Sequence, residues 1–404
     1  MPEPQQAQQN EEARSTRFSR VLLALILGQI GLHATMAGVR MAAPLLALRD
    51  GHSAWSIGVL MALYAAAPVL LSLRAGRMAD RHGYHRPVRI AIALSLLGAL
   101  TALGATFAGA GPRFALLGVS AALVGSGANL GLIVIQRAAG QAVRSNAERV
   151  RMFSWLGVAP SLSNVIGPVS AGLMIDAAGF RAAFGLMLML PLLTLWCTRL
   201  IPAEAAPGRA AADVARSSWP LLAAPGLKRL MVVNWVLSAC WDVHTFAVPI
   251  LGFERGFSAT TIGLILGTFT LSVSGVRLLI PLWAHRISEI ALLRAAMIGT
   301  GIVFGLYPLA HAPWLMALCA ALLGLTLGAV QPMIMSMLHQ LTPDRRYGEA
   351  IGMRSMVMNA SSTAMPLVFG ATGAAIGAAA LFWLVGGAVA SGSWVARRLP
   401  GGAA

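Results

Sequence analysis

The stretch Arg74–Arg86, "RAGRMADRHGYHR", lies between two long apolar runs and is rich in basic residues. It also holds one acid, Asp80, and two glycines, Gly76 and Gly83. A short basic segment between apolar runs is typical of a loop that joins two membrane-spanning helices. The stretch therefore predicts a membrane protein, and it raises the question of why glycines and an acid are spaced among the arginines.

The composition of the whole chain supports this prediction. Of its 404 residues, 57% are hydrophobic and 11% are charged, and the mean hydropathy is +0.73. Soluble domains carry about 25% charged residues. A formal charge of +16 would suggest a nucleic-acid partner in a soluble protein, but almost no Lys or Arg lies inside the apolar runs. The charge is therefore expected to mark membrane topology, and no nucleic acid is expected to bind.

Twelve apolar runs are long enough to cross a hydrocarbon core about 30 Å thick, which takes roughly 20 helical residues. The first run is too long for the apolar region of a signal peptide, so it is expected to remain as a span. The expected spans are 21–48, 55–73, 88–108, 114–136, 153–175, 182–201, 229–251, 260–280, 290–310, 314–338, 351–371 and 376–396.

The distribution of basic residues predicts the orientation. Most of the 30 Lys and Arg residues lie in loops on the same side as the two termini. Loops on the opposite side hold four arginines: Arg49, Arg113, Arg181 and Arg255. By the positive-inside rule, both termini and the Arg74–Arg86 loop are expected to be cytoplasmic, in a bacterial-type inner membrane.

The two halves of the chain resemble each other. Pro44–Gly58 aligns with Pro249–Gly263, and a slightly different shift pairs Gly179 with Gly377. Duplicated halves that rock around a midplane cavity are common in secondary transporters. The sequence therefore predicts an all-α membrane protein with twelve transmembrane helices in two pseudo-symmetric six-helix bundles around a central cavity. The expected parts are an N-terminal tail (1–20), a first bundle (21–201), a cytoplasmic linker (202–228), a second bundle (229–396) and a C-terminal tail (397–404).

The opening stretch resembles the signature loop of the major facilitator superfamily. A simple positive-inside loop would explain its arginines but not its spaced glycines and acid. The resemblance implies a latch that holds the cytoplasmic side closed, with Asp80 capping the eleventh span near Glu349 and Arg354. A degraded copy at Pro281–Arg286 has no acid and is expected to latch more weakly. The motif consists of Gly76, Asp80, Arg81, Gly83 and Arg86.

A second motif lies in the fifth expected span. Ser163–Gly172, "SNVIGPVSAG", resembles the antiporter motif of proton-coupled drug exporters in the same superfamily. Its Gly167, Pro168 and Gly172 are expected to bend the helix and let a neighbouring helix approach closely. Small residues and proline are also common in other membrane helices, so the motif favours export without identifying a substrate.

Two positions that are often charged in such exporters hold Thr35 and Ala121 here, so a coupling residue is sought among other buried polar residues. Polar residues recur at helical spacing on one face of the first and seventh spans. Asp242 is an acid placed well inside a span, and the imidazole of His33 suits proton relay near neutral pH. The two faces are Gln29, His33 and Arg40 in the first span, and Asn234, Ser238, Asp242 and Thr245 in the seventh.

Three interpretations of Arg40 and Asp242 remain open at this point. In the first, the two residues form an ion pair that gates the outer side. In the second, they anchor an anionic or zwitterionic substrate, and in the third they relay protons. A charge at the centre of a membrane helix costs about 2.5–3.5 kcal/mol on insertion scales, which argues against a charge without a role. Further hydrogen-bonding candidates for the cavity are Tyr64, Asn129, Asn164, Gln331 and Asn359.

The sequence thus predicts a secondary transporter that works by alternating access, most directly a proton-coupled exporter of a small, largely apolar organic compound. One alternative is a symporter that imports an organic acid through Arg40 and His33, and a second is a receptor or scaffold, which the short tails disfavour. No Walker loop, metal cluster or nucleophile motif occurs, so neither an enzyme, a cofactor nor a metal site is expected. The expected partners are a small-molecule substrate, protons and the lipid bilayer, with the protein as a monomer.

Overall fold

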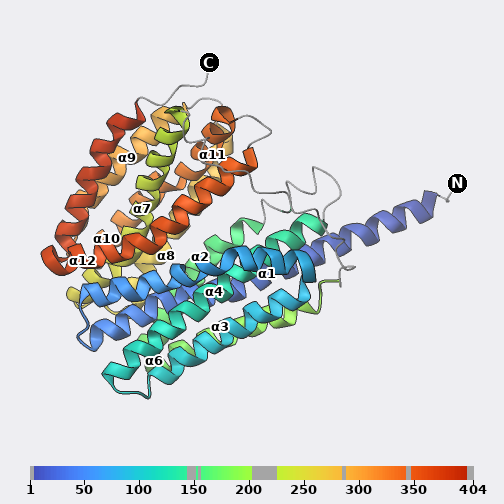
Figure 1. Cartoon of the computed structure of the whole chain (residues 1–404), viewed down its shortest axis with the longest axis horizontal. Helices are drawn as coiled ribbons and strands as arrows, with labels where there is room; N and C mark the ends of the chain where they lie inside the picture. The colour runs from blue at the N-terminus through green and yellow to red at the C-terminus, as the bar shows by residue number, and fades with distance from the viewer. Residues whose placement is uncertain are drawn as a thin grey trace.

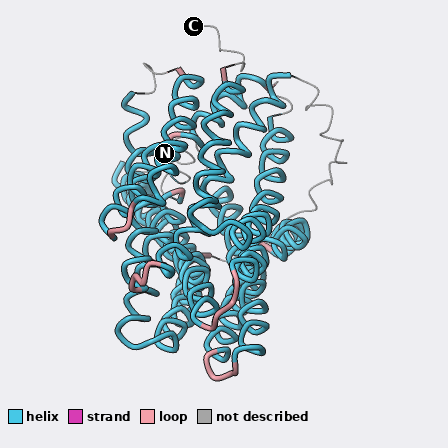
Figure 2. The backbone as a smooth tube through the Cα atoms, turned by 90° about the vertical axis from the view of Figure 1, so that its left-hand side faces the viewer, coloured by secondary structure: helices cyan, strands magenta, loops and turns pink. Residues whose placement is uncertain are grey.

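The computed structural model describes residues 4–142, 152, 156–202, 225–283, 288–342 and 347–397. These residues are almost entirely helical and include no strand (Figure 2). Nine helical stretches within them are long and apolar enough to cross a membrane, and Ala54–Val69 is a shorter apolar stretch. The elements are α1 (Pro4–Arg49), α2 (Ala54–His82), α3 (His85–Ala105), α4 (Ala110–Ala142), α6 (Val158–Thr198), α7 (Pro225–Glu254), α8 (Ala259–Trp283), α9 (Glu289–Leu306), η3 (Tyr307–Leu309), α10 (Pro313–Gly328), α11 (Val330–Leu341) and α12 (Tyr347–Ala396).

Helix α6 in the first half and helix α12 in the second half each consist of two helices joined at a glycine. Gly179 has φ 82° and ψ 177°, and Gly377 has φ 83° and ψ 160°. Glycine adopts such a conformation readily because it has no Cβ atom. These are the two glycines that the internal alignment pairs, so the sequence repeat corresponds to a repeated break in the backbone.

A second turn also occurs twice. Gly51 (φ 85°) follows α1 and Gly256 (φ 71°) follows α7. Two residues later, the hydroxyls of Ser53 and Ser258 accept hydrogen bonds from backbone N–H groups in the first turns of α2 and α8. A serine in this position satisfies an N–H group that would otherwise lack a partner at the start of a helix. The aligned segments of the two halves therefore form the same helix–turn–helix connection.

Several helix boundaries differ from the expectations. Helix α2 continues to His82, past the expected end at residue 73, so most of the stretch Arg74–Arg86 is helical and not a loop. Helix α1 begins at Pro4, inside the expected tail, and α7 begins at Pro225, inside the expected linker, whose residues 203–224 lie outside the described part. The expected span 314–338 is divided at Ala329 into α10 and α11. Pro332 lies one turn after this division, and its ring lacks an N–H group and clashes with the carbonyl four residues earlier, which explains the break.

Helices pack mainly within their own half of the chain. In Figure 1 the helices coloured blue to green lie below those coloured yellow to red. Helix α1 packs on α6 and α3 on α4, while α10 packs on α8 and α12 on α7 and α9. Contacts between the halves are made chiefly by α6 with α8 and by α12 with α2. These two pairs of helices therefore control how the halves are joined.

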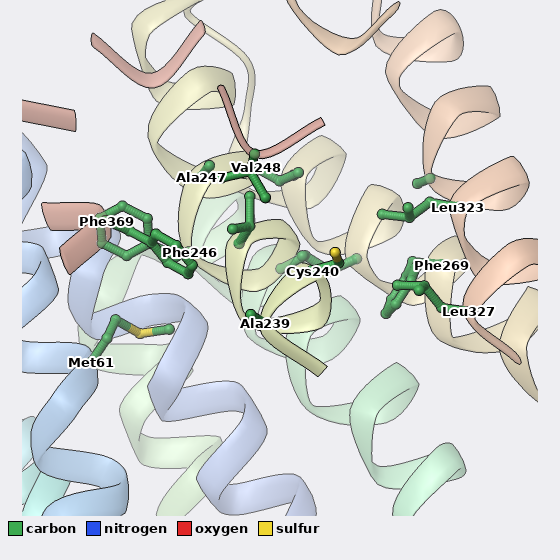
Figure 3. Packing of buried hydrophobic residues seen from close by; sticks show 14 of the residues in the cluster. Met61, Ala239, Cys240, Phe246, Ala247, Val248, Phe269, Leu323, Leu327 and Phe369 are labelled. Carbon is green, nitrogen blue, oxygen red and sulfur yellow. The ribbon is translucent and has the colours of Figure 1, made fainter. Parts of the chain in front are cut away.

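Buried apolar side chains extend across the junction between the halves. The rings of Phe246 on α7 and Phe369 on α12 face each other with centroids 6.2 Å apart, and Met61 of α2 lies beside them (Figure 3). Phe269 of α8 is 1% exposed and belongs to the same cluster. The core is thus continuous from α2 to α8.

The end of the molecule at which α1 ends and α2 begins is here called the distal end. Its four arginines are the ones that the sequence placed on the sparsely charged side. Arg113 donates to both carboxylate oxygens of Asp50, at 2.7 and 2.9 Å. Arg255 donates to backbone carbonyls of η3 and of Ala310, which follows it. Arg49 lies over the ring of Phe180 and Arg181 over that of Phe107.

Candidate functional site

The distal ends of α6 and α8 are joined by a carboxylate. The two oxygens of Asp176 accept hydrogen bonds from the backbone N–H groups of Ala259 (3.1 Å) and Thr260 (2.7 Å), the first residues of α8. Asp176 lies beyond the expected span 153–175. Burial raises the pKa of Asp176, but hydrogen bonds from Thr260, Ser258 and Ala259 lower it by more, so this pKa lies below its ordinary value. The cap is therefore charged at neutral pH and complements the positive end of α8.

The glycines of the antiporter-like motif lie at helix contacts. A methyl group on Gly167 would overlap the backbone of Ala34 in α1, and one on Gly172 would overlap the backbone of Ala259 in α8. The carbonyl of Pro168 faces Gly263 of α8 in the same way. Along this motif, the backbone of α6 thus lies in close contact with the backbones of α1 and α8.

The contact between α2 and α12 uses small residues and no acid. Gly58 of α2 lies against the backbone of Pro366 and Gly370, and Gly370 lies against Ala54 and Trp55. No side chain there corresponds to Asp176, because the position of α12 paired with it holds Ala374. The two junctions between the halves are therefore chemically different.

A cavity of about 160 Å³ lies among α1, α2, α4 and α12. One part of its wall is polar and the rest is apolar. The polar side chains that line it are His33, Arg40, Tyr64, Asn129, Asn359 and Ser362, and the larger apolar ones are Met36, Met61, Pro68 and Leu132. Several residues that the sequence selected as cavity candidates are thus brought together here, from helices distant in the chain.

Three polar atoms on the polar face of α1 are buried and have no hydrogen-bond partner among the described residues. Oε1 of Gln29, Nδ1 of His33 and Nε of Arg40 are inaccessible and make no hydrogen bond to any described residue. The hydroxyl of Tyr64, 94% buried on α2, also lacks a partner among these residues. Unsatisfied buried polar atoms are uncommon in folded proteins and call for an explanation.

The polar face of α7 is bound to α12. Oδ1 of Asn234 accepts a hydrogen bond from Nε of Arg354 (3.2 Å), and Oδ2 of Asp242 accepts one from the hydroxyl of Ser362 (3.5 Å). The hydroxyl of Thr245 donates to carbonyls of its own helix. Ser238 is half-buried on the same helix, and Nδ2 of Asn234 has no partner within the described ranges.

Arg40 and Asp242 do not form an ion pair in this structure. Their side chains are both described, and no nitrogen of Arg40 is within 4.0 Å of the carboxylate of Asp242. Arg40 also lines a second cavity of about 40 Å³, together with Asn164, Trp241 and Thr245. Arg40 therefore lines two cavities, one with α2, α4 and α12 and one with α6, α7 and α8.

The expected latch lies mostly outside the described residues. The side chains of Asp80 and Arg81, the surroundings of Gly76, the side chain of Glu349 and most of Pro281–Arg286 are not described. The backbone of Gly83 is described, and this residue ends α2 with φ 65°, a conformation that favours glycine. Arg86 is exposed in the first turn of α3. The capping role of Asp80 remains a prediction.

Other polar candidates are used in packing. Nδ2 of Asn164 donates to the carbonyl of Pro160, and Gln331 accepts from Arg277. The hydroxyl of Thr35 donates to carbonyls of Gly31 and Met187, which ties α1 to α6. Within the described ranges, no three His, Cys, Asp or Glu side chains form a group that could hold a metal ion.

Comparisons with known proteins give a matching family model, one curated relative and solved structures of the same fold. A family model described as Major Facilitator Superfamily matches residues 25–233 and 230–401. A tetracycline resistance protein of class C from Escherichia coli is 28% identical over 389 residues, covering 91% of this chain and 94% of that protein. Among solved structures, the nucleoside transporter NupG has a TM-score of 0.75 at 13% identity, covering 94% of this chain and 99% of its own. A peptide transporter of the POT family in complex with alafosfalin also scores 0.75, at 15% identity and 93% coverage of both chains.

Proposed function

Because the chain belongs to the major facilitator superfamily, we propose that it is a secondary active transporter that works by alternating access. The proposed reaction is proton-coupled export of a small organic compound that is largely apolar. The family assignment makes it a multi-pass membrane protein and gives no support to an enzymatic activity.

The proposed architecture has twelve spans in two six-helix bundles, with both termini cytoplasmic in a bacterial-type inner membrane. Two of the long helices supply two spans each, because α6 breaks at Gly179 and α12 at Gly377. In this orientation the distal end faces the outside. The protein is proposed to act as a monomer.

Two observations support the proposal: a cavity with ionisable side chains, and a junction between the halves that is closed at the distal end. The cavity contains Arg40 and His33 and is lined by α1, α2, α4 and α12. The junction joins α6 to α8 and is held by Asp176 and by the close contacts of Gly172. Alternating access requires this junction to open while the opposite side closes. The glycine contacts between α6 and α8 and between α2 and α12 would then separate, and the Arg74–Arg86 segment at the end of α2 would latch the cytoplasmic side.

Two features support export. The tetracycline resistance protein is similar along nearly the whole chain, and the motif in α6 resembles that of proton-coupled drug exporters. Asp242 is the proposed proton-binding group, with His33 as the second choice. A proton taken up by Asp242 from the outside would drive the conformational change that returns the empty cavity to the cytoplasm.

A second candidate function is import of an organic acid together with protons. Arg40 favours it, because its buried Nε has no hydrogen-bond partner among the described residues and a carboxylate that enters beside His33 would accept hydrogen bonds from the guanidinium. No observation favours a receptor or scaffold.

Flux measurements in proteoliposomes with an imposed pH gradient test these functions. The assay uses lipophilic cations, neutral drugs and organic acids, and a pH-sensitive dye inside the vesicles. Protons moving opposite to an organic compound would support the exporter, whereas protons moving with an acid would support the importer. No substrate-dependent flux of any class would contradict both.

A further inference from the structure

The charge of Arg40 lies inside α1 beside a cavity. Its Nε atom is buried without a partner, and it forms no ion pair with any residue that the structure describes. The nearby acid Asp242 is instead bound to Ser362. A guanidinium held in a membrane interior is costly unless an anion or hydrogen-bond acceptors compensate its charge.

Arg40 shares its cavity with other groups that can donate hydrogen bonds. The hydroxyl of Tyr64 and a ring nitrogen of His33 are buried and unpartnered on the same wall, and the amides of Asn129 and Asn359 complete it. Among the described residues no carboxylate lines this cavity, and the carboxylate of Asp242 lies behind Ser362, whose hydroxyl it binds. The wall therefore presents a guanidinium and hydrogen-bond donors to whatever enters, which suits an anion.

The opposite part of the wall is apolar. Met36, Met61, Pro68 and Leu132 line it. Methionine side chains adapt to differently shaped apolar ligands. The volume of about 160 Å³ is below the 300–1,000 Å³ typical of sites for drug-sized ligands, so the enclosed part fits an acidic group and about one ring.

We propose that this cavity binds the ionised form of an amphipathic organic acid. Its carboxylate pairs with Arg40 and accepts a hydrogen bond from Tyr64, and its apolar body lies against Met36 and Met61. The proposal rests on the proposed transport function and adds the class of substrate. It holds for export and for import, because it concerns the bound state and not the direction of movement.

Equilibrium binding to the full-length protein in lipid nanodiscs tests this proposal. The probes are benzoate, 2-naphthoate and indole-3-acetate, each compared with its uncharged carboxamide. Hydrogen bonds to charged groups are worth enough to give the carboxylates a preference of about tenfold or more. Arg40→Gln is expected to abolish this preference, and Arg40→Lys to retain part of it.

Two further variants make the result specific. Tyr64→Phe removes one hydroxyl and is expected to weaken carboxylate binding several-fold with little effect on the amides. Arg277→Gln removes another guanidinium from a membrane helix, outside this cavity, and is expected to leave the preference unchanged. If Arg40→Gln does not fold, the preference of the wild type and the effect of Tyr64→Phe decide.

The outcomes separate this proposal from the proposed function. Carboxamides binding as tightly as carboxylates, no binding of any carboxylate, or a preference that survives Arg40→Gln would overturn the acid site. The protein would remain a transporter if flux of other compounds persisted in proteoliposomes. Absence of all flux would overturn the transport function, whatever the binding data show.

Discussion

The polar faces of α1 and α7 occupy corresponding positions in the two halves, but their side chains have different surroundings. On α7, Asn234 and Asp242 lie two helical turns apart and accept hydrogen bonds from two residues of α12, Arg354 and Ser362. On α1, polar atoms of Gln29, His33 and Arg40 are buried without partners in the described structure. One face ties helices together, and the other is left with unused hydrogen-bonding capacity.

This difference separates a structural role from a binding role. A polar group that has a partner gains nothing from a ligand unless the partner leaves, whereas an unpartnered buried group gains the full interaction. The α1 face is therefore expected to govern affinity. The α7 face is expected to govern stability and, through Asp242, the coupling of the two halves to protons.

The largest effect is expected for Asp242→Asn. Asparagine keeps the shape and an oxygen that can accept the hydrogen bond from Ser362, but it cannot exchange a proton. Transport driven by a pH gradient should fall at least about tenfold, and its remaining pH dependence should flatten. Ser362→Ala is the matched control, because it removes the hydrogen bond and leaves the carboxylate. An unchanged pH profile of transport in Asp242→Asn would remove Asp242 from the coupling role.

A smaller effect, on stability, is expected for Asn234→Leu. The substitution takes away an acceptor of the buried Arg354 side chain, and leaving a charged donor short of a partner costs about 1–3 kcal/mol. The free energy of unfolding in detergent or nanodiscs should drop by that amount. A loss below about 0.5 kcal/mol would mean that the α7 face does not stabilise the second half in this way.

Parts of this arrangement follow from the sequence. The internal alignment paired Gly51 with Gly256 and Gly179 with Gly377, and in the structure all four have positive φ, a conformation that favours glycine. The helical period also placed Gln29, His33 and Arg40 on one face. These features are local, because each depends only on the residue types and spacing within one segment of the chain.

Other parts depend on segments that meet only in the folded chain. The Asp176 cap joins positions more than 80 residues apart, and nothing near Asp176 indicates that α8 begins beside it. The partners of Asn234 and Asp242 on α12 were missed for the same reason. The break at Ala329 had a local signal in Pro332, which the apolar run concealed.

Asp176 provides a reference for a carboxylate with both oxygens bound, in contrast to Asp242. Asp176→Asn is expected to weaken the α6–α8 closure by about 0.3–1 kcal/mol, the usual worth of a charge at a helix end. Spin labels on cysteines introduced at the exposed positions Ala178 and Glu254, with the native cysteines replaced, would report a larger population of long distances.

The closure also has an expected pH dependence. Because the pKa of Asp176 is lowered in the closed form, its contribution is present above the ordinary aspartate value near 3.9 and is lost as the pH falls through the lowered value. Acidification below about pH 4 should therefore lengthen the label distance in the wild type. It should add nothing in Asp176→Asn, and an equal response in both proteins would assign the change to another group.

The smallest effect is expected for Gln29→Leu, on the face that lacks partners. Gln29 is 2% exposed, and its Oε1 atom makes no hydrogen bond to a described residue. Replacing an unsatisfied buried polar group by an apolar one of similar size is close to neutral or slightly stabilising. The free energy of unfolding should thus stay the same or rise, in contrast to Asn234→Leu at the corresponding face of α7. A loss of more than about 1 kcal/mol would show that Gln29 has a structural partner, and the distinction between the two faces would then rest on Arg40 alone.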